Sequence, residues 1–191
     1  MGGGMARKSG RVRYVAFLRG INVGGHRVKM ERLRELFAEL GFEGAETFIA
    51  SGNVIFRGPA GDPAGIEAKV EAHLGRALGY AVDTFLRTTD ELAAVVAARP
   101  FAEEEAGAPG HSLYVAFLRG PLAGEAERAL LAFRTEVDEL HVRGRELHWL
   151  CRGKMTDSKI EWRKLERAIA MSTTVRNMTM LRKLAALYPP G

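Results

Sequence analysis

The seven residues YVAFLRG occupy Tyr14–Gly20 and recur unchanged at Tyr114–Gly120. Apolar side chains fall on both alternating faces of this stretch, which predicts a strand that is buried on both sides. The chain continues as INVGGHRVK after the first copy and as PLAGEAER after the second. Because this stretch is kept in both places while only the first copy is followed by the longer loop, its first role is expected to be structural, and that loop becomes the candidate for a site.

The residues around the first copy predict alternating strands and helices. Leu33, Leu36, Phe37 and Leu40 recur at helical spacing, and Gly41 is typical of a residue that ends a helix. The expected elements are the strand Val12–Leu18, the helix Met30–Leu40, the strands Glu46–Ala50 and Val54–Arg57, a helix that opens at Asp62 and Pro63 and ends at Leu78, the strand Val82–Leu86, and a helix from the capping box Thr88–Glu91 to Arg99.

The second half predicts the same order of elements. They are the strand Leu113–Leu118, the helix Glu125–Val137, a hairpin that turns at Arg143–Arg145, a helix opened by the capping-box pair Ser158 and Glu161, the extended piece Thr173–Val175, and the helix Met178–Leu187. One insertion of about eight residues after the first strand keeps the two halves in register. The order βαββαβ predicts an α+β fold with an internal duplication of two ferredoxin-like subdomains, each with a trailing helix.

The expected domain organisation follows from this duplication. Residues 1–11 form a disordered lead-in, 12–99 the first subdomain, 100–111 a linker rich in Glu, Ala, Gly and Pro, and 112–191 the second subdomain. No apolar run approaches the roughly 18 residues of a membrane span, and a single cysteine, Cys151, excludes a disulfide framework. We therefore expect a cytoplasmic protein with no membrane partner.

Charge is distributed unevenly along the chain, whose formal net charge is +5. Residues 5–34 and 141–191 are rich in Lys and Arg, whereas residues 35–111 carry most of the acids. Two basic ends favour an anionic partner such as a nucleotide, a phosphorylated metabolite or a nucleic acid. An arginine-rich composition alone would give the same excess of basic residues. The charge therefore does not decide whether the protein has an anionic partner.

The strongest candidate site is the loop from Arg19 to Lys29, which leaves the first strand and leads into a helix. Gly24 and Gly25 let backbone amides approach an anion, and the N-terminus of the helix adds partial positive charge. The three cationic side chains, Arg19, Arg27 and Lys29, complete a cradle for phosphate or carboxylate, and Asn22 supplies an amide. The structural alternative is a connection whose glycines only form turns, and an interface loop is a third possibility.

Two further segments contribute candidate ligand-binding residues. Ser51 and Asn53 lie in the hairpin turn, with a hydroxyl and an amide that could serve a ligand, although Asn and Gly are ordinary turn residues. Arg176 and Asn177 precede the last helix. They could bind an anion at its N-terminus, or Asn177 could simply cap the helix.

The sequence contains no familiar catalytic or metal-binding motif. GxxxxGK[ST], GxGxxG, HExxH, CxxC and GxSxG are all missing. Cys151 follows an apolar stretch and is expected to be a small buried side chain and not a nucleophile. No metal ligand or cofactor is therefore assigned. An enzyme acting on a phosphorylated substrate and a non-catalytic interaction module stay as alternatives to a binding protein.

Several segments together resemble a known family of bacterial proteins, the domain of unknown function 1697. They are YVAFLRGINVGG, VKMERLRELFAELGF, TFIASGNVIF, and SK with TTVRNMTMLRKL near the end. The resemblance implies two ferredoxin-like subdomains and no established activity, substrate or cofactor. The family's motif positions correspond to Arg19, Gly20, Asn22, Gly24, Gly25, Ser51, Gly52, Asn53, Arg176 and Asn177. We expect a small anionic ligand, or nucleic-acid phosphate, to bind at the glycine-rich loop.

Overall fold

The computed structural model describes residues 10–22, 24–49 and 52–191. It contains two compact units. Residues up to Asp90, with the last two residues of the chain, form the first unit, and Glu91–Pro189 form the second. Most of the expected lead-in lies outside the described residues, and Arg11 at its end already begins a strand. The division after Asp90 precedes the segment 100–111, whose role as a linker stays a prediction.

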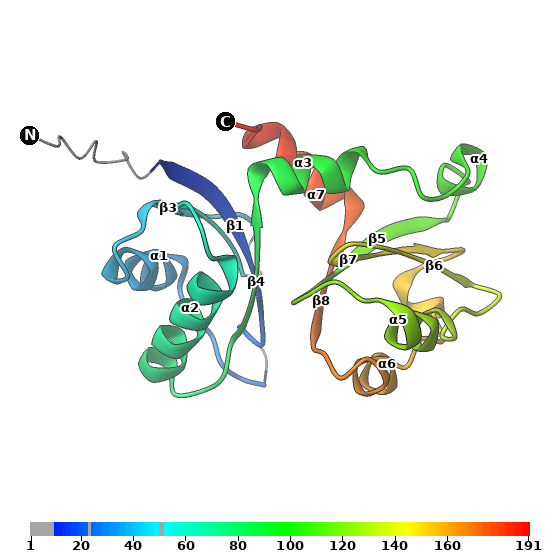
Figure 1. Ribbon diagram of the computed structural model, residues 1–191, viewed down its shortest axis with the longest axis horizontal. Coiled ribbons are helices and arrows are strands. Elements are labelled where there is room, and N and C mark those ends of the chain that lie inside the picture. Colours follow the sequence, from blue (N-terminus) through cyan, green and yellow to red (C-terminus); the bar gives the residue numbers. More distant parts are fainter. Residues whose placement is uncertain (1–9, 23, 50–51) are drawn as a thin grey trace, which may run out of the picture. The chain divides into compact units, whose positions relative to one another are not determined.

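The first unit is a four-stranded antiparallel sheet with two helices on one face (Figure 1). Its elements are β1 (Arg11–Arg19), α1 (Met30–Glu39), β2 (Glu43–Thr47), β3 (Asn53–Pro59), α2 (Pro63–Leu78) and β4 (Asp83–Thr88). The strand order is β2-β3-β1-β4, so the first YVAFLRG lies inside the sheet between β3 and β4. The core beneath α1 and α2 includes Tyr14, Phe37 and Phe56.

The second unit has a sheet of the same kind, with α5 (Gly124–Leu131) and α6 (Trp162–Ala168) on one face (Figure 1). Its other elements are α3 (Thr89–Ala97), α4 (Glu103–Ala106), β5 (Ser112–Leu118), β6 (Asp138–Arg143), β7 (Glu146–Cys151), a 3₁₀ turn at Met155–Asp157, β8 (Thr173–Asn177) and α7 (Met178–Leu187). The strand order is β6-β7-β5-β8. The α+β class with two antiparallel sheets is therefore confirmed.

Trp149 on β7 is the centre of the core under α5 and α6. Its ring stacks on Tyr114, with ring centroids 4.5 Å apart, and meets the edge of Trp162 at 5.3 Å. Its indole Nε1 donates a 2.8 Å hydrogen bond to Asp138 Oδ1, and that carboxylate has no exposed surface. The buried indole is thus satisfied by a buried acceptor, as burial of a polar group requires.

Both copies of the repeated segment are buried on both faces. Ala16 belongs to the core under the helices, and Val15 and Phe17, whose side chains point to the opposite face, are 0% exposed. Val115 and Phe117 in β5 are equally buried. The prediction of a strand that is buried on both sides is confirmed.

Two predicted helix boundaries are confirmed by backbone geometry. Gly41 follows α1 with a φ of +78°, a conformation that favours glycine after a helix. Pro63 is the first residue of α2, with Asp62 in an extended conformation just before it. Proline suits this position because the first helical N–H has no partner within the helix.

The predicted helix Glu125–Val137 is too long, because α5 ends at Leu131. The hydroxyl of Thr135 accepts hydrogen bonds from the backbone N–H groups of Val137 and Asp138, and it donates to the Asp138 carboxylate at 2.7 Å. Threonine therefore offers the backbone a local turn in place of further helical hydrogen bonds.

The predicted capping box at Ser158 and Glu161 is wrong in part, because α6 begins only at Trp162. The Ser158 hydroxyl accepts from Ile160 N within a turn, and Lys159 N donates to buried Asp138. These bonds hold the segment in an extended path before the helix starts.

The predicted strand Glu46–Ala50 lies too late in the sequence, because β2 covers Glu43–Thr47. The pairing with β3 shifts between Glu43 and Glu46, and with this irregularity the strand begins at Glu43 and not at Glu46. Ile49 then has a φ of +44°, which no regular strand tolerates. The apolar residues Phe48 and Ile49 look like a continuing strand in the sequence, so the end of β2 at Thr47 was not predicted.

Helical glutamates cover the outer edges of β4 and β8. In the first unit, Glu67 and Glu71 of α2 accept hydrogen bonds from the N–H groups of Leu86 and Thr84, each at 2.7 Å. In the second unit, Glu166 of α6 accepts from Thr173 N at 2.8 Å. Each edge strand thus finds partners for backbone groups that the sheet leaves unpaired.

Candidate functional site

The glycine-rich loop leaves β1 after Arg19 and enters α1 at Met30. Asn22 closes it, because its side-chain Oδ1 accepts a 2.7 Å hydrogen bond from Val28 N. Asn22 itself has a φ of +57°, in the left-handed region that asparagine tolerates better than most residues. The amide expected to serve a ligand therefore also shapes the loop.

The hairpin turn between β2 and β3 lies against the start of this loop. Gly52 O accepts from Leu18 N at 2.7 Å, and a Cβ added to Gly52 would lie 2.5 Å from Cγ2 of Ile21. Asn53 is buried, and its Nδ2 donates to Phe48 O at 3.0 Å. The turn and the loop therefore form one edge of the first unit, which only glycine at position 52 permits.

The contacts that join the predicted segments of the first unit are the bond between Asn22 and Val28 and the approach of Gly52, next to Asn53, to Leu18 and Ile21. Gly24 and Gly25 have φ values of +61° and +87° and are exposed, as is Lys29 just before α1. Ser51 lies outside the described residues.

Positive charge gathers on the exposed part of the loop. Arg27 and Lys29 form no hydrogen bond or ion pair through their side chains with any other described residue. The ring of His26 stacks on Tyr80, with centroids 4.2 Å apart. Burial raises the pKa of Tyr80, whose hydroxyl has no hydrogen-bond partner in the part of the chain that the structure describes.

The N-terminus of α1 offers backbone donors beside these cations. Among the described residues no side chain caps the helix at Lys29, so within this part of the chain the amides of its first turn have no capping acceptor. The acid of that turn, Glu31, is engaged with Arg34 at 3.3 Å. The sequence therefore places the cationic side chains of Arg27 and Lys29 next to the N–H groups and the partial positive charge of the helix N-terminus. This arrangement is suited to binding an anion.

Arg176 and Asn177 lie in the second unit, whereas the loop belongs to the first. Arg176 is mostly buried and donates to Thr174 Oγ1 and Val175 O, and burial lowers its pKa to about 10. Asn177 Oδ1 accepts from Met180 N at 2.7 Å, so the predicted helix cap at Asn177 is confirmed. Both side chains have structural partners within their own unit.

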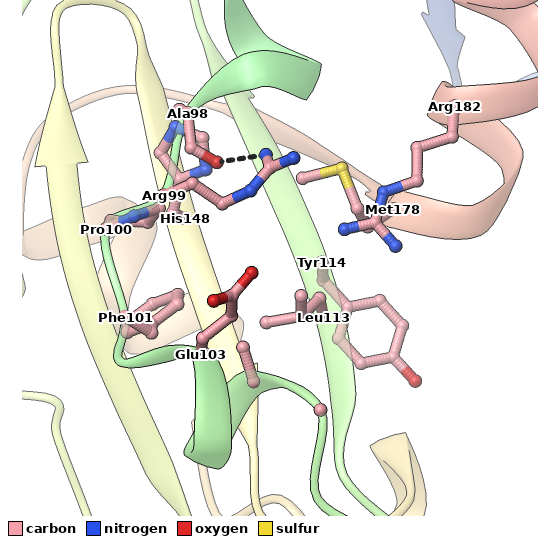
Figure 2. Close-up of a pocket in the computed structure, with 12 residues that line it drawn as sticks. Ala98, Arg99, Pro100, Phe101, Glu103, Leu113, Tyr114, His148, Met178 and Arg182 are labelled. Carbon is pink, nitrogen blue, oxygen red and sulfur yellow. Dashed lines mark hydrogen bonds between the residues drawn. The ribbon is translucent and has the colours of Figure 1, made fainter.

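Sequence reasoning missed a cavity of about 250 Å³ in the second unit. Its walls come from the end of α3, the segment 100–107, β5, β7 and α7 (Figure 2). Arg99, Glu103 and Arg182 bring charge to it, and Leu113 and Met178 bring apolar surface. No single spacing in the sequence marks these residues, because they come from separate segments of the second unit, with only Met178 and Arg182 sharing a helix.

His148 lies at the inner wall of this cavity and is only 2% exposed. Burial lowers its pKa to about 4, and repulsion from His141 and Arg143 acts in the same direction. The imidazole is therefore neutral near pH 7, where it can both donate and accept a hydrogen bond. Its ring has no hydrogen-bond partner among the residues described.

No set of three or more His, Cys, Asp or Glu side chains among the described residues is arranged to hold a metal ion. None of their helices combines the length and the apolar character that crossing a membrane takes.

Comparisons with known proteins concern the fold and the family. A solved structure of conserved bacterial protein SP0830 from Streptococcus pneumoniae is 20% identical, with a TM-score of 0.72 over 93% of this chain and 98% of that chain. The likeness shows a shared fold. No curated protein matches the sequence. The model of a family described as proteins of unknown function, DUF1697, matches residues 12–148. Because that match covers well over half of the sequence, the chain belongs to the DUF1697 family.

Proposed function

We propose that this protein binds a small phosphorylated ligand, such as a nucleotide, at the glycine-rich loop of its first unit. The observation that carries the proposal is the exposed pair Arg27 and Lys29, without carboxylate partners among the described residues, beside the uncapped start of α1. The proposal includes a cytoplasmic location, for which the single buried cysteine is the support.

Two contacts hold the described part of the loop in place. The bond from Val28 N to Asn22 fixes its two ends, and Ile21 anchors it in the core. Preorganised donors bind an anion better than mobile ones because less conformational freedom is lost on binding. Arg19, at the end of β1, is expected to add a charge-assisted hydrogen bond to a phosphate oxygen.

A fluorescent ADP analogue, titrated at low salt and followed by anisotropy, tests this proposal. The double variant Arg19→Ala with Lys29→Ala is expected to weaken binding at least tenfold, because each charge-assisted hydrogen bond contributes about 1.5–3 kcal/mol. The matched control is Arg32→Ala with Arg34→Ala. It removes the same charge from α1, but from side chains that pair with helical glutamates.

Unchanged binding by the loop variant would overturn the proposal, and so would an equal loss in the control, because general charge would then explain the binding. Competition by unlabelled pyrophosphate supports a small ligand. A single-stranded oligonucleotide that competes far more strongly would point to nucleic acid instead.

We further propose that the two units descend from one duplicated ferredoxin-like unit. Support comes from equivalent places in the two sheets. Val15 pairs with Arg87 on β4, and Val115 pairs with Arg176 on β8. Each arginine donates to the carbonyl of its preceding residue, at 2.7 and 2.9 Å. An experimental structure in which the two sheets did not superpose strand for strand would overturn this descent.

A further inference from the structure

The cavity of the second unit has the size and lining of a small-molecule site. Its volume is about 250 Å³. An apolar cavity of about 150 Å³ accommodates benzene, so this one has room for a single ring with a short chain. Phe101, Leu113 and Met178 supply the apolar surface against which such a group would lose contact with water.

Two guanidinium groups reach the same cavity from different elements. Figure 2 shows Arg99, after α3, and Arg182, on α7, on either side of the Met178 side chain. Arg99 donates through one nitrogen to Val96 O and Ala98 O, which leaves its other nitrogen atoms for a ligand. Arg182 forms no ion pair with any other residue that the structure describes.

The remaining polar groups set the charge that the cavity prefers. Glu103 brings one carboxylate, so with two arginines and a neutral His148 the lining carries a net charge of one positive unit. Such a lining suits a monoanion, whose single negative charge it balances. Guanidinium groups hold carboxylates well because their planar arrangement of donors matches the two carboxylate oxygens.

We propose that this cavity is a second binding site, separate from the glycine-rich loop, and that its ligand is a small monocarboxylic acid with a compact apolar body. The carboxylate lies between Arg99 and Arg182, and the apolar body lies against Leu113 and Met178. Polar groups that fix orientation within mostly apolar walls are typical of sites for small organic ligands.

Calorimetric titration of the full chain with 4-phenylbutyrate tests this site, with 4-phenylbutan-1-ol as the neutral counterpart of similar shape. We expect the acid to bind at least tenfold more tightly than the alcohol. Arg182→Gln is expected to remove that preference, whereas Lys183→Gln, which neutralises the exposed neighbour on the same helix, is expected to leave it unchanged.

A second variant tests the apolar part of the site without altering charge. Ala106→Leu places three more carbon atoms at the wall, on a helical residue, and should weaken the acid and the alcohol alike by tenfold or more. Absence of phenylbutyrate binding would overturn the proposal. Equal affinity for acid and alcohol would do the same, as would an equal effect of Arg182→Gln and Lys183→Gln. Lys29→Ala should leave phenylbutyrate binding intact, which separates this site from the loop.

Discussion

His148 is expected to make the second unit sensitive to acid. It lies in the middle of β7, directly opposite His141 on β6, and is 2% exposed. Burial is the main cause that lowers its pKa from 6.5 to about 4, with repulsion from His141 and Arg143 as lesser causes. The perturbation is therefore a change of pH, compared between the wild-type chain and His148→Gln, which cannot be protonated in this range.

The direction in which stability changes with pH follows from the pKa of His148 in the unfolded chain and in the folded chain. In the unfolded chain the imidazole takes up a proton below about pH 6.5, whereas in the folded chain it stays neutral down to about pH 4. Because the unfolded state binds the extra proton between these values, the free energy of unfolding falls as the pH drops from 6.5 to 4 and levels off below. The shift corresponds to a loss of about 3 kcal/mol across that window.

Other charged groups lie around the same histidine. On the side of the cavity these are Arg99, Glu103 and Arg182, and on the other side Arg145 pairs with Glu91 at 2.7 Å. They are present in both proteins, so their own titration cancels when the variant is subtracted from the wild type.

Tryptophan fluorescence is a selective assay, since both tryptophans, Trp149 and Trp162, belong to the second unit. Urea unfolding from pH 4 to pH 8 should show the difference between wild type and His148→Gln changing by about 3 kcal/mol. The control His141→Gln removes an exposed histidine, and this variant should still lose most of the same free energy of unfolding as the pH falls. A difference that stayed constant within about 1 kcal/mol over the range would refute a neutral, buried His148.

Three further outcomes are expected. Gly52→Ala should lower the free energy of unfolding by about 2–4 kcal/mol, because the added Cβ would meet Ile21 and the φ of this residue is +76°. Gly24→Ala should lower it by only about 1 kcal/mol, because no atom of the described residues lies within 4 Å of the added Cβ. Circular dichroism during thermal unfolding compares the two variants. Cys151, whose pKa is raised by burial and by nearby carboxylates, should react with a thiol reagent only as the chain unfolds, and rapid labelling of the native protein would contradict this. Asp138→Ala should lower stability by about 3 kcal/mol in urea, because it leaves an indole N–H and two other donors without their acceptor, and a loss below 1 kcal/mol would argue against that role.

Local patterns predicted most of the fold. The repeated YVAFLRG identified the inner strand of both sheets because its alternation requires burial on two faces. Gly41 and Pro63 marked helix ends because each has a backbone property that other residues lack. Two helix predictions failed because a side chain competes for the backbone, near in the sequence at Thr135 and distant at Asp138. The carboxylate of Asp138, for instance, holds the backbone at Lys159 and delays α6.

Of the two candidate sites, the sequence predicted the loop but not the cavity. The loop was visible in the sequence because its glycines and cations are consecutive, and the structure adds that Asn22 and Asn53 use their amides within the protein. The cavity was invisible because Arg99 and Arg182 look like ordinary surface charges in the sequence. Their meeting depends on how α3 and α7 pass β5, which no spacing of residues reports.

The glutamates along β4 and β8 bear on how the protein behaves at high concentration. A second chain that approached either strand to extend the sheet would meet the N–H groups of Thr84, Leu86 and Thr173 already occupied by carboxylates. Strand addition of this kind is how exposed edges lead to aggregation. Resistance to it therefore depends on three glutamates that belong to helices, so substituting one of them on α2 or α6 can reduce solubility without changing the sequence of any strand.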